Sequence, residues 1–322
     1  MRAGRPPVNS GARPLLLLSL MAALCQACSG SAPAPEPRVL VGCVADPRGF
    51  PGDGGFYLGA AVSGTSDLST REEELGQTLP LHRRYYHADD IRTATREATQ
   101  DIRARRLPWI SFKLPYSWAD MAAGRGDAWT DRLGTALAGV PGPVWLAFHH
   151  EPEGEGDLAD WVAMQRRLAP RVASLTDNVA LTLIITAWHL VNSPDTHTLD
   201  LYWPGDGIVD ILAFDAYNEW GSVKDGVEIT EWSSLYQYVS IVAPFAERYG
   251  IEWAVAETGW NDNAATRDPY WFSSQVQVVR RQGGIAVAYF DSSLESTTDW
   301  TLNEPVKLAD FASVLGDSAR IC

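Results

Sequence analysis

The sequence predicts a single (β/α)8 TIM barrel, and three observations lead to this expectation. From residue 57 onward, short apolar segments alternate with amphipathic ones, and there are eight apolar segments. Eight such repeats over about 260 residues match the size of a closed barrel of parallel strands. The chain has 322 residues, of which 46% are hydrophobic and 20% charged, and no internal linker or charge block divides it. We therefore expect one large domain over residues 43–322.

The individual elements follow from two sequence patterns: continuous apolar runs for buried strands and amphipathic segments for helices. Buried parallel strands are near-continuous apolar runs, and such runs cover 57–63, 81–86, 109–114, 144–150, 181–187, 208–214, 253–257 and 284–290. Amphipathic segments typical of helices cover 66–76, 89–106, 127–138, 157–173, 232–249 and 269–282. Segment 189–207 contains Pro194, Pro204 and Gly205 and is expected to be a loop. An open, doubly wound sheet is the main alternative, but residues 59–64 lack the G-x-G-x-x-G turn that usually follows its first strand.

Two glutamates stand where expected strands end and Gly/Pro-rich loops begin. Glu151 ends the run 144–151, and Glu257 ends the run 253–257. The carboxyl ends of barrel strands form the rim that carries catalytic residues, and the fourth and seventh strands face each other across it. A retaining glycosidase needs an acid and a nucleophilic carboxylate about 5–5.5 Å apart. The pair therefore indicates cleavage of a glycosidic bond, with Glu151 and Glu257 as the catalytic residues.

Three short motifs resemble glycoside hydrolase family 26. They are His150-Glu151-Pro152-Glu153-Gly154, Glu257-Thr258-Gly259 and the strand Asp210 to Asn218. The resemblance implies that Glu151 is the acid/base and Glu257 the nucleophile of a double displacement. It also implies that His150 stands beside the acid/base and that Tyr217 forms a hydrogen bond to the nucleophile.

The chain departs from the family after the acid/base. Family members that act on mannan carry an aromatic cluster there, whereas residues 153–157 are acidic and are expected to be flexible. The resemblance therefore leaves β-mannan, β-glucan and xylan open as substrates.

Further candidate substrate-binding residues follow the strands at the same rim. Asp215 and Tyr217 share one face of the sixth strand by its period of two. Trp188, Trp260 and Trp300 lie just past the fifth, seventh and eighth strands. Indole rings pack against the C–H faces of sugars, so these tryptophans are expected to bind substrate.

Neither a metal nor an organic cofactor is expected. Successive strand residues point to opposite faces, so His149 and His150 do not suit one ion, and no H-E-x-x-H motif is present. For His150 and Glu151 both to face the mouth, the strand end must twist or bulge. Two other functions stay open: a catalytically weak carbohydrate-binding barrel, and a Schiff-base enzyme for which Lys113 is the one strand-end lysine.

The N-terminus predicts export. Three arginines precede the apolar segment 15–24, which is too short to span a bilayer. We expect a signal peptide over residues 1–28 and a Pro-rich linker over 29–42. Ala27-Cys28 resembles a lipoprotein cleavage site, so the protein is expected to be secreted or tethered to the cell surface through a lipidated Cys28.

The net charge restricts the kinds of binding partner, and the cysteine count predicts a disulfide. The net charge is −14, and loss of residues 1–27, which hold three Arg and no acid, makes it −17. Such acidity argues against nucleic acid and anionic membrane surfaces and is compatible with a neutral polysaccharide bound by a monomer. After export Cys43 and Cys322 remain, and because they flank the barrel we expect them to form a disulfide.

Overall fold

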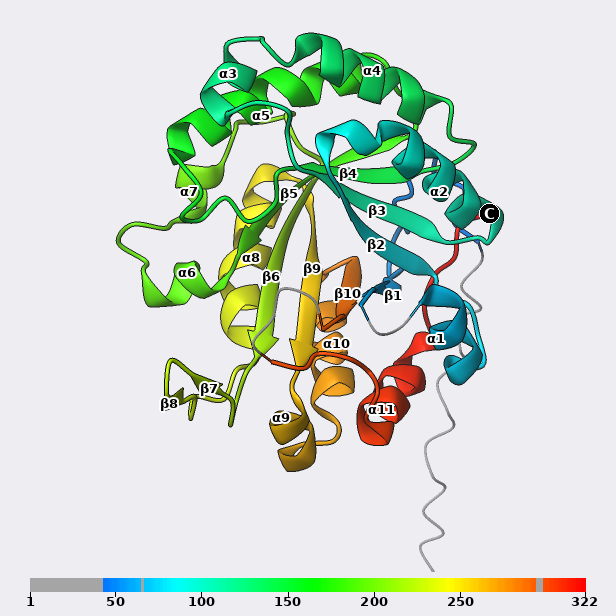
Figure 1. Ribbon diagram of the computed structural model, residues 1–322, viewed down its shortest axis with the longest axis vertical. Helices are drawn as coiled ribbons and strands as arrows, with labels where there is room; N and C mark the ends of the chain where they lie inside the picture. Colours follow the sequence, from blue (N-terminus) through cyan, green and yellow to red (C-terminus); the bar gives the residue numbers. More distant parts are fainter. Residues whose placement is uncertain (1–42, 65–66, 294–297) are drawn as a thin grey trace, which may run out of the picture. The chain divides into compact units, whose positions relative to one another are not determined.

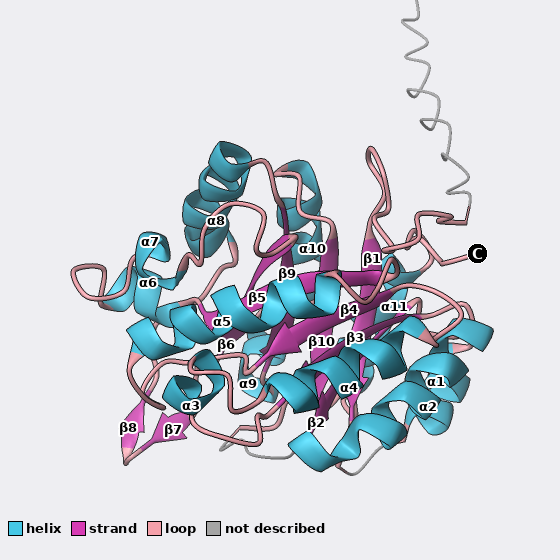
Figure 2. Cartoon of the chain, turned by 90° about the horizontal axis from the view of Figure 1, so that it is seen from above, coloured by secondary structure: helices cyan, strands magenta, loops and turns pink. Residues whose placement is uncertain are grey.

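The computed structural model describes residues 43–64, 67–293 and 298–322. Eight parallel strands close into a barrel in the order β1-β10-β9-β6-β5-β4-β3-β2. Helices surround this barrel on its outside (Figures 1 and 2). The prediction of a single TIM barrel is confirmed, and the open-sheet alternative is wrong because β1 pairs with both β2 and β10.

The elements have the following bounds. The barrel strands are β1 (Tyr57–Val62), β2 (Leu81–Tyr86), β3 (Leu107–Phe112), β4 (Val144–Phe148), β5 (Val179–Thr186), β6 (Ile211–Asn218), β9 (Glu252–Trp260) and β10 (Ala286–Asp291). A hairpin of β7 (Val223–Lys224) and β8 (Val227–Glu228) follows β6. The helices are α1 (Leu68–Leu75), α2 (Ile91–Arg103), α3 (Trp118–Ala122), α4 (Asp127–Ala138), α5 (Leu158–Ala173), α6 (Trp188–Asn192), α7 (Leu199–Tyr202), α8 (Tyr236–Tyr249), α9 (Asp262–Arg267), α10 (Trp271–Arg281) and α11 (Pro305–Leu315).

The prediction of a loop over residues 189–207 is wrong in part, because this segment includes most of the short helix α6 and all of α7. Leu190, Leu199 and Tyr202 are buried there. Burial of these side chains stabilises single helical turns that local propensity alone does not. Helix α11 was also not expected, although Pro305 at its first position is a typical helix start.

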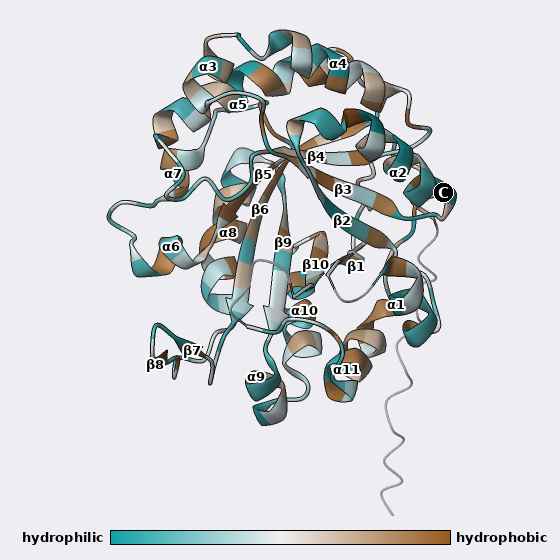
Figure 3. Cartoon of the chain, viewed as in Figure 1, coloured by the Kyte–Doolittle hydropathy of each residue, from teal (hydrophilic) through white to brown (hydrophobic). Residues whose placement is uncertain are grey.

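The core has two parts, because strand side chains alternate between the barrel axis and the helices. Figure 3 shows hydrophobic residues in brown along the barrel strands and on the helices around them. The outer part packs the helices against residues such as Leu146, Leu183 and Phe214. The inner part is narrow at the strand starts, where Trp109 and Trp145 meet edge to face at 5.2 Å. Higher up, the inner positions are small, including Ala147, Ala256 and Ala288. These small side chains leave room for polar residues near the rim.

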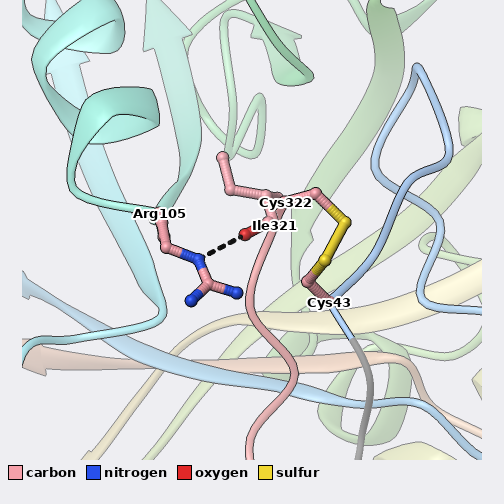
Figure 4. Close-up of a disulfide and its surroundings, with 4 residues drawn as sticks. All are labelled: Cys43, Arg105, Ile321 and Cys322. Carbon is pink, nitrogen blue, oxygen red and sulfur yellow. Dashed lines mark hydrogen bonds between the residues drawn. A yellow bond between two sulfur atoms is a disulfide. The ribbon is translucent and has the colours of Figure 1, made fainter.

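The two ends of the described chain close the bottom of the barrel. Val44 forms a parallel bridge with Ile321, and both pack into the inner core. The predicted Cys43–Cys322 disulfide is present, with Cα atoms 4.8 Å apart, and Arg105 donates a hydrogen bond to the Ile321 carbonyl beside it (Figure 4). The disulfide thus joins residues 279 positions apart.

The expected signal peptide, the lipidation site at Cys28 and the linker over residues 29–42 lie outside the described residues. Across residues 43–64, 67–293 and 298–322, no helix is both long enough and apolar enough to cross a membrane.

Candidate active site

A register shift in β9 turns Glu257 toward the barrel axis. Phe214 pairs with Val255, but the next residue of β6, Asp215, pairs with Glu257, so Ala256 is an extra residue. The pairing of β9 with β10 shifts at the same place. Ala254 and Ala256 already point inward, so strict alternation would turn Glu257 outward. The bulge reverses this alternation and places Glu257 inside the rim.

At the end of β4, a tight turn and not a bulge directs the glutamate toward the barrel mouth. The strand ends at Phe148, and His149 and Glu151 have positive φ angles of 47° and 52°. Left-handed backbone is uncommon for residues other than glycine and concentrates at functional sites. This turn allows both His150 and Glu151 to face the mouth, which the alternation of a regular strand forbids.

The Glu257 carboxylate is held from two sides. Tyr217 donates a hydrogen bond to Oε2 at 2.6 Å, as the resemblance implied, and Tyr85 donates to Oε1 at 2.7 Å. On the Oε1 side Arg83 Nη2 lies at 3.5 Å and His150 Nε2 at 3.9 Å. These contacts fix the orientation of the Glu257 carboxyl group, as a nucleophile requires.

Glu151 lies in a different environment. It accepts a hydrogen bond from the Thr186 hydroxyl at 3.1 Å. Burial, followed by the charge of Glu257, raises the pKa of Glu151 to about 7. A carboxyl group with this pKa keeps its proton near neutral pH and can donate it. The two glutamates therefore differ in the way that an acid and a nucleophile must differ.

Two further polar residues lie beside these glutamates: Asp215 is the register partner of Glu257, and His150 precedes Glu151. Asp215 is 1% exposed, and its carboxyl oxygens have no hydrogen-bond partner among the described residues. Burial, and then the charge of Glu257, raises the pKa of Asp215 well above its usual range. Burial and the Arg83 charge hold the pKa of His150 well below its usual range, so its imidazole is neutral. A neutral His150 lies beside Glu257 without adding charge.

The loop after Glu151 is held on both sides rather than left free. Glu153 accepts hydrogen bonds from the Thr186 backbone N–H, and Glu155 pairs with Lys113 at 3.1 Å. Glu155 also lies 2.6 Å from His149 Nε2. The acidic residues that suggested flexibility are thus the ones that anchor this loop.

A cleft of about 300 Å³ opens next to the loop. Its walls include Lys113, Tyr116, Trp118, His149 and Glu155. His149 is part of this wall, whereas neither Glu151 nor Glu257 is.

The three candidate tryptophans have different positions. Trp188 begins α6 and is 51% exposed, so its ring is accessible beside Thr186. Trp300 is 4% exposed and packs on Tyr217 with ring centroids 4.7 Å apart. Trp260 is fully buried, because after the bulge alternation turns it outward onto Phe272. The expectation that Trp260 stacks on a sugar is therefore corrected: its ring is a core side chain.

The Schiff-base alternative gains nothing from the structure. Lys113 is 43% exposed in its side chain and forms an ion pair with Glu155, so it does not lie in the desolvated pocket that a Schiff-base lysine needs. Within the parts of the chain that are described, no group of three His, Cys, Asp or Glu side chains is arranged to hold a metal ion.

Three contacts of the site were missed at the sequence level: those of Arg83, Tyr85 and Thr186. The signal for two of them is present, because Arg83 and Tyr85 share the inward face of Leu81 in a strand that must be buried on both faces. A charged residue on the inner face of such a strand indicates a polar partner inside the barrel. Thr186 carries no comparable signal, since threonine is common in strands.

Comparisons with known proteins agree with this architecture. No protein-family model matches the sequence. Endoglucanase H from Acetivibrio thermocellus is 24% identical over 237 residues, which is 65% of this chain and 23% of the endoglucanase. The chain thus spans less than a quarter of that relative's length.

Solved structures give a clearer likeness. A GH26 β-mannanase from Bacteroides ovatus superposes with a TM-score of 0.59 at 15% identity, covering 81% of this chain and 88% of the mannanase. Thermotoga maritima Cel5A, solved with mannotriose, gives a TM-score of 0.60 at 10% identity, covering 81% of this chain and 98% of Cel5A. At these identities the likeness concerns the fold alone: the chain has the (β/α)8 barrel fold of these proteins.

Proposed function

We propose that this protein is a retaining glycoside hydrolase that cleaves a β-linked polysaccharide by double displacement. The observation that carries the proposal is the contrast between the two rim glutamates. Glu257 is held by two tyrosine hydroxyls, whereas Glu151 is buried and has a pKa raised to about 7. This contrast matches the division of labour between nucleophile and acid.

In the proposed first step, Glu257 attacks the anomeric carbon and Glu151 gives its proton to the leaving oxygen. The glycosyl–Glu257 ester forms as the glycosidic bond breaks. In the second step Glu151, now ionised, takes a proton from water, which attacks the same carbon and releases Glu257. Tyr85 and Tyr217 orient the nucleophile throughout, and neither step draws on a metal or an organic cofactor.

The substrate class rests on the fold likeness and on the rim. The similar structures include proteins described as mannanases and as a Cel5A bound to mannotriose or cellobiose. The exposed ring of Trp188 offers a surface for a sugar, and Trp300 supports Tyr217. We propose a neutral β-mannan, β-glucan or xylan, bound by a monomer that is exported and released or tethered through Cys28. The Cys43–Cys322 disulfide fits an oxidising compartment.

Two variants test the roles of the glutamates. Glu257→Ala is expected to abolish turnover on every substrate. Glu151→Ala is expected to spare formation of the glycosyl-enzyme from aryl glycosides with good leaving groups, because these need no acid. Azide should then rescue the second step. Purified protein is assayed for reducing ends on mannan, mixed-linkage glucan and xylan, and for aryl release with and without azide.

The outcomes separate the enzyme from its main alternative. Turnover that survives Glu257→Ala, or equal losses in Glu151→Ala on activated and unactivated substrates without azide rescue, contradicts the proposal. Binding to one of the polymers without any turnover by the wild type would instead favour a carbohydrate-binding barrel.

A further inference from the structure

Glu153 is connected to the acid/base through one residue of the neighbouring strand. The Thr186 backbone N–H lies 3.2 Å and 3.3 Å from the two Glu153 carboxyl oxygens. The hydroxyl of the same Thr186 donates to Glu151 Oε1 at 3.1 Å. Thr186 therefore holds two carboxyl groups at once, through its backbone and through its side chain.

We propose that Glu153 is a positioning residue for the acid/base. Through Thr186 it fixes the direction of the hydroxyl that orients Glu151, and its negative charge favours the protonated form of Glu151. This inference rests on the proposed function and adds to it a third carboxylate, which works on the acid rather than on the substrate.

The geometry explains why Glu153 can act at a short distance. Pro152 separates the two glutamates and is buried, and Glu151 has a left-handed backbone. Proline fixes its own φ angle, so the relative placement of the two side chains has little freedom. The hydrogen bonds from β5 to both carboxyl groups then lock the loop against that strand. Such indirect support is how reactive groups are kept in productive geometry.

Several charged groups face Glu151, and Glu153 acts beside them. Burial and the charge of Glu257 on β9 raise the pKa of Glu151 most, the Glu153 charge raises it further, and Arg83 on β2 opposes them. Asp215 on β6 interacts with the same groups. Around Glu153 itself, burial raises the pKa, and the Tyr202 phenol of α7 and the Thr186 backbone face its carboxyl group.

The other glutamate of this loop provides a matched control. Glu155 lies two residues further on, but it faces Lys113 and His149 on the opposite side, and its side chain is 47% exposed. Its charge is paired and solvated, so we expect it to affect the pKa of Glu151 less than the charge of Glu153 does. Glu153→Gln and Glu155→Gln thus remove the same charge from the same loop, on different sides.

The experiment compares the pH dependence of kcat/KM for Glu153→Gln, Glu155→Gln and the wild type. The probes are an alkyl and a dinitrophenyl β-glycoside of one sugar. Glu153→Gln keeps an oxygen that accepts from the Thr186 N–H but removes the charge. For Glu153→Gln with the alkyl glycoside, we expect the alkaline limb of the kcat/KM profile to move to lower pH, by roughly a few tenths of a unit. The dinitrophenyl glycoside should show no such shift, because it needs no acid in the first step.

Thr186→Val and Thr186→Ser test the connection. The Val variant keeps the backbone N–H for Glu153 but lacks the hydroxyl, so kcat on the alkyl glycoside is expected to fall with KM unchanged, and Ser should restore it. The proposal is overturned if the kcat/KM profile of Glu153→Gln has the same alkaline limb as the wild type. It is also overturned if Glu155→Gln shifts this limb as far as Glu153→Gln does. A Thr186→Val variant as active as the wild type also overturns the bridging role.

A titration that needs no turnover separates this inference from the proposed function. The ¹³C resonance of the Glu151 carboxyl group, assigned by its loss in Glu151→Gln, is followed against pH. A lower midpoint in Glu153→Gln supports the inference even if the protein hydrolyses no glycoside, and an unchanged midpoint overturns it even if the protein does. Survival of turnover in Glu257→Ala contradicts the proposed function alone.

Discussion

The two ends of the barrel are built on opposite principles. At the bottom, Tyr57, Trp109 and Trp145 pack edge to face, and the Val44–Ile321 bridge closes the interior. At the rim, Glu151, Asp215 and Glu257 bring three carboxyl groups close together in a largely buried space, where burial and the charge of Glu257 raise the pKa of Glu151 and of Asp215. The bottom is optimised for packing, whereas the rim places groups in states that packing alone disfavours.

The difference extends to the backbone. The left-handed residues His149 and Glu151 each carry strain of about 1–3 kcal/mol, and β9 loses regular pairing at its bulge. The described bottom instead gains a covalent link between residues 43 and 322. Packing and the disulfide stabilise the bottom, whereas the rim carries the strained residues. Substitutions at the rim should therefore affect turnover, and substitutions at the bottom should affect unfolding.

The largest expected effect comes from one hydroxyl at the rim. Tyr217→Phe removes the donor to Glu257 Oε2 and should lower kcat by about 100-fold, the size typical of losing one preorganised donor. Unfolding by urea should change little, because the ring and its packing on Trp300 remain. Reaction rates on the preferred polysaccharide and urea midpoints check both expectations.

A tyrosine at the bottom is the matched control. The buried hydroxyl of Tyr57 has no hydrogen-bond partner among the described residues. Tyr57→Phe should therefore leave turnover unchanged and keep or slightly increase stability. Equal losses of turnover in the two variants would break the comparison between the ends.

The second prediction concerns the bottom alone. Replacing Cys43 and Cys322 by Ser opens a link across 279 residues. The free energy of unfolding is expected to fall toward the upper end of about 2–5 kcal/mol, because the unfolded chain gains freedom. Denaturant unfolding measures this loss, and turnover below the new melting temperature should match that of the wild type. A selective loss of turnover in a folded double variant would show that the bottom influences the rim.

The smallest expected effect is a pH dependence of stability. The pKa of Glu151 is about 7 in the folded protein and near 4.5 when exposed. A raised carboxyl pKa stabilises the fold below pH 4.5, and this contribution is lost as the pH rises from 4.5 through 7. Glu151→Gln should remove that loss, so the melting temperature of the variant should fall less than that of the wild type between pH 5 and 8. Parallel pH profiles of the two proteins would contradict the raised pKa.

The alkaline limb of kcat/KM on unactivated substrate should likewise lie near pH 7, since Glu151 must be protonated to act. An aryl glycoside with a good leaving group serves as the control, because its first step lacks this requirement.

The fold and the catalytic pair follow from patterns that operate over short stretches. Apolar runs of strand length, separated by amphipathic segments, leave few architectures other than a parallel barrel. Glu151 and Glu257 stand out because each ends such a run. The hydrogen bond from Tyr217 to Glu257 was predicted from the resemblance and is present. The Cys43–Cys322 disulfide was predicted because these are the two cysteines that remain after export, and it is also present.

What the sequence did not reveal depends on backbone detail. Trp260 lies past the expected strand 253–257, but β9 continues to Trp260, and the bulge at Ala256 decides which side of the sheet its ring occupies. Thr186 became part of the site only because Glu153 and Glu151 both turn toward β5. Neither fact is visible in composition or periodicity, since both depend on local departures from regular strand geometry.

The extra residue in β9 also puts residue numbers out of step with strand positions. Ala256 contributes a methyl group that many residues could replace, so a substitution scan would pass over it. Deleting it would leave Val255 opposite Phe214 and Glu257 opposite Asp215, so regular alternation alone would keep Glu257 inward and Trp260 outward. An alignment to distant barrels that omits a gap here would therefore match the nucleophile to the wrong column.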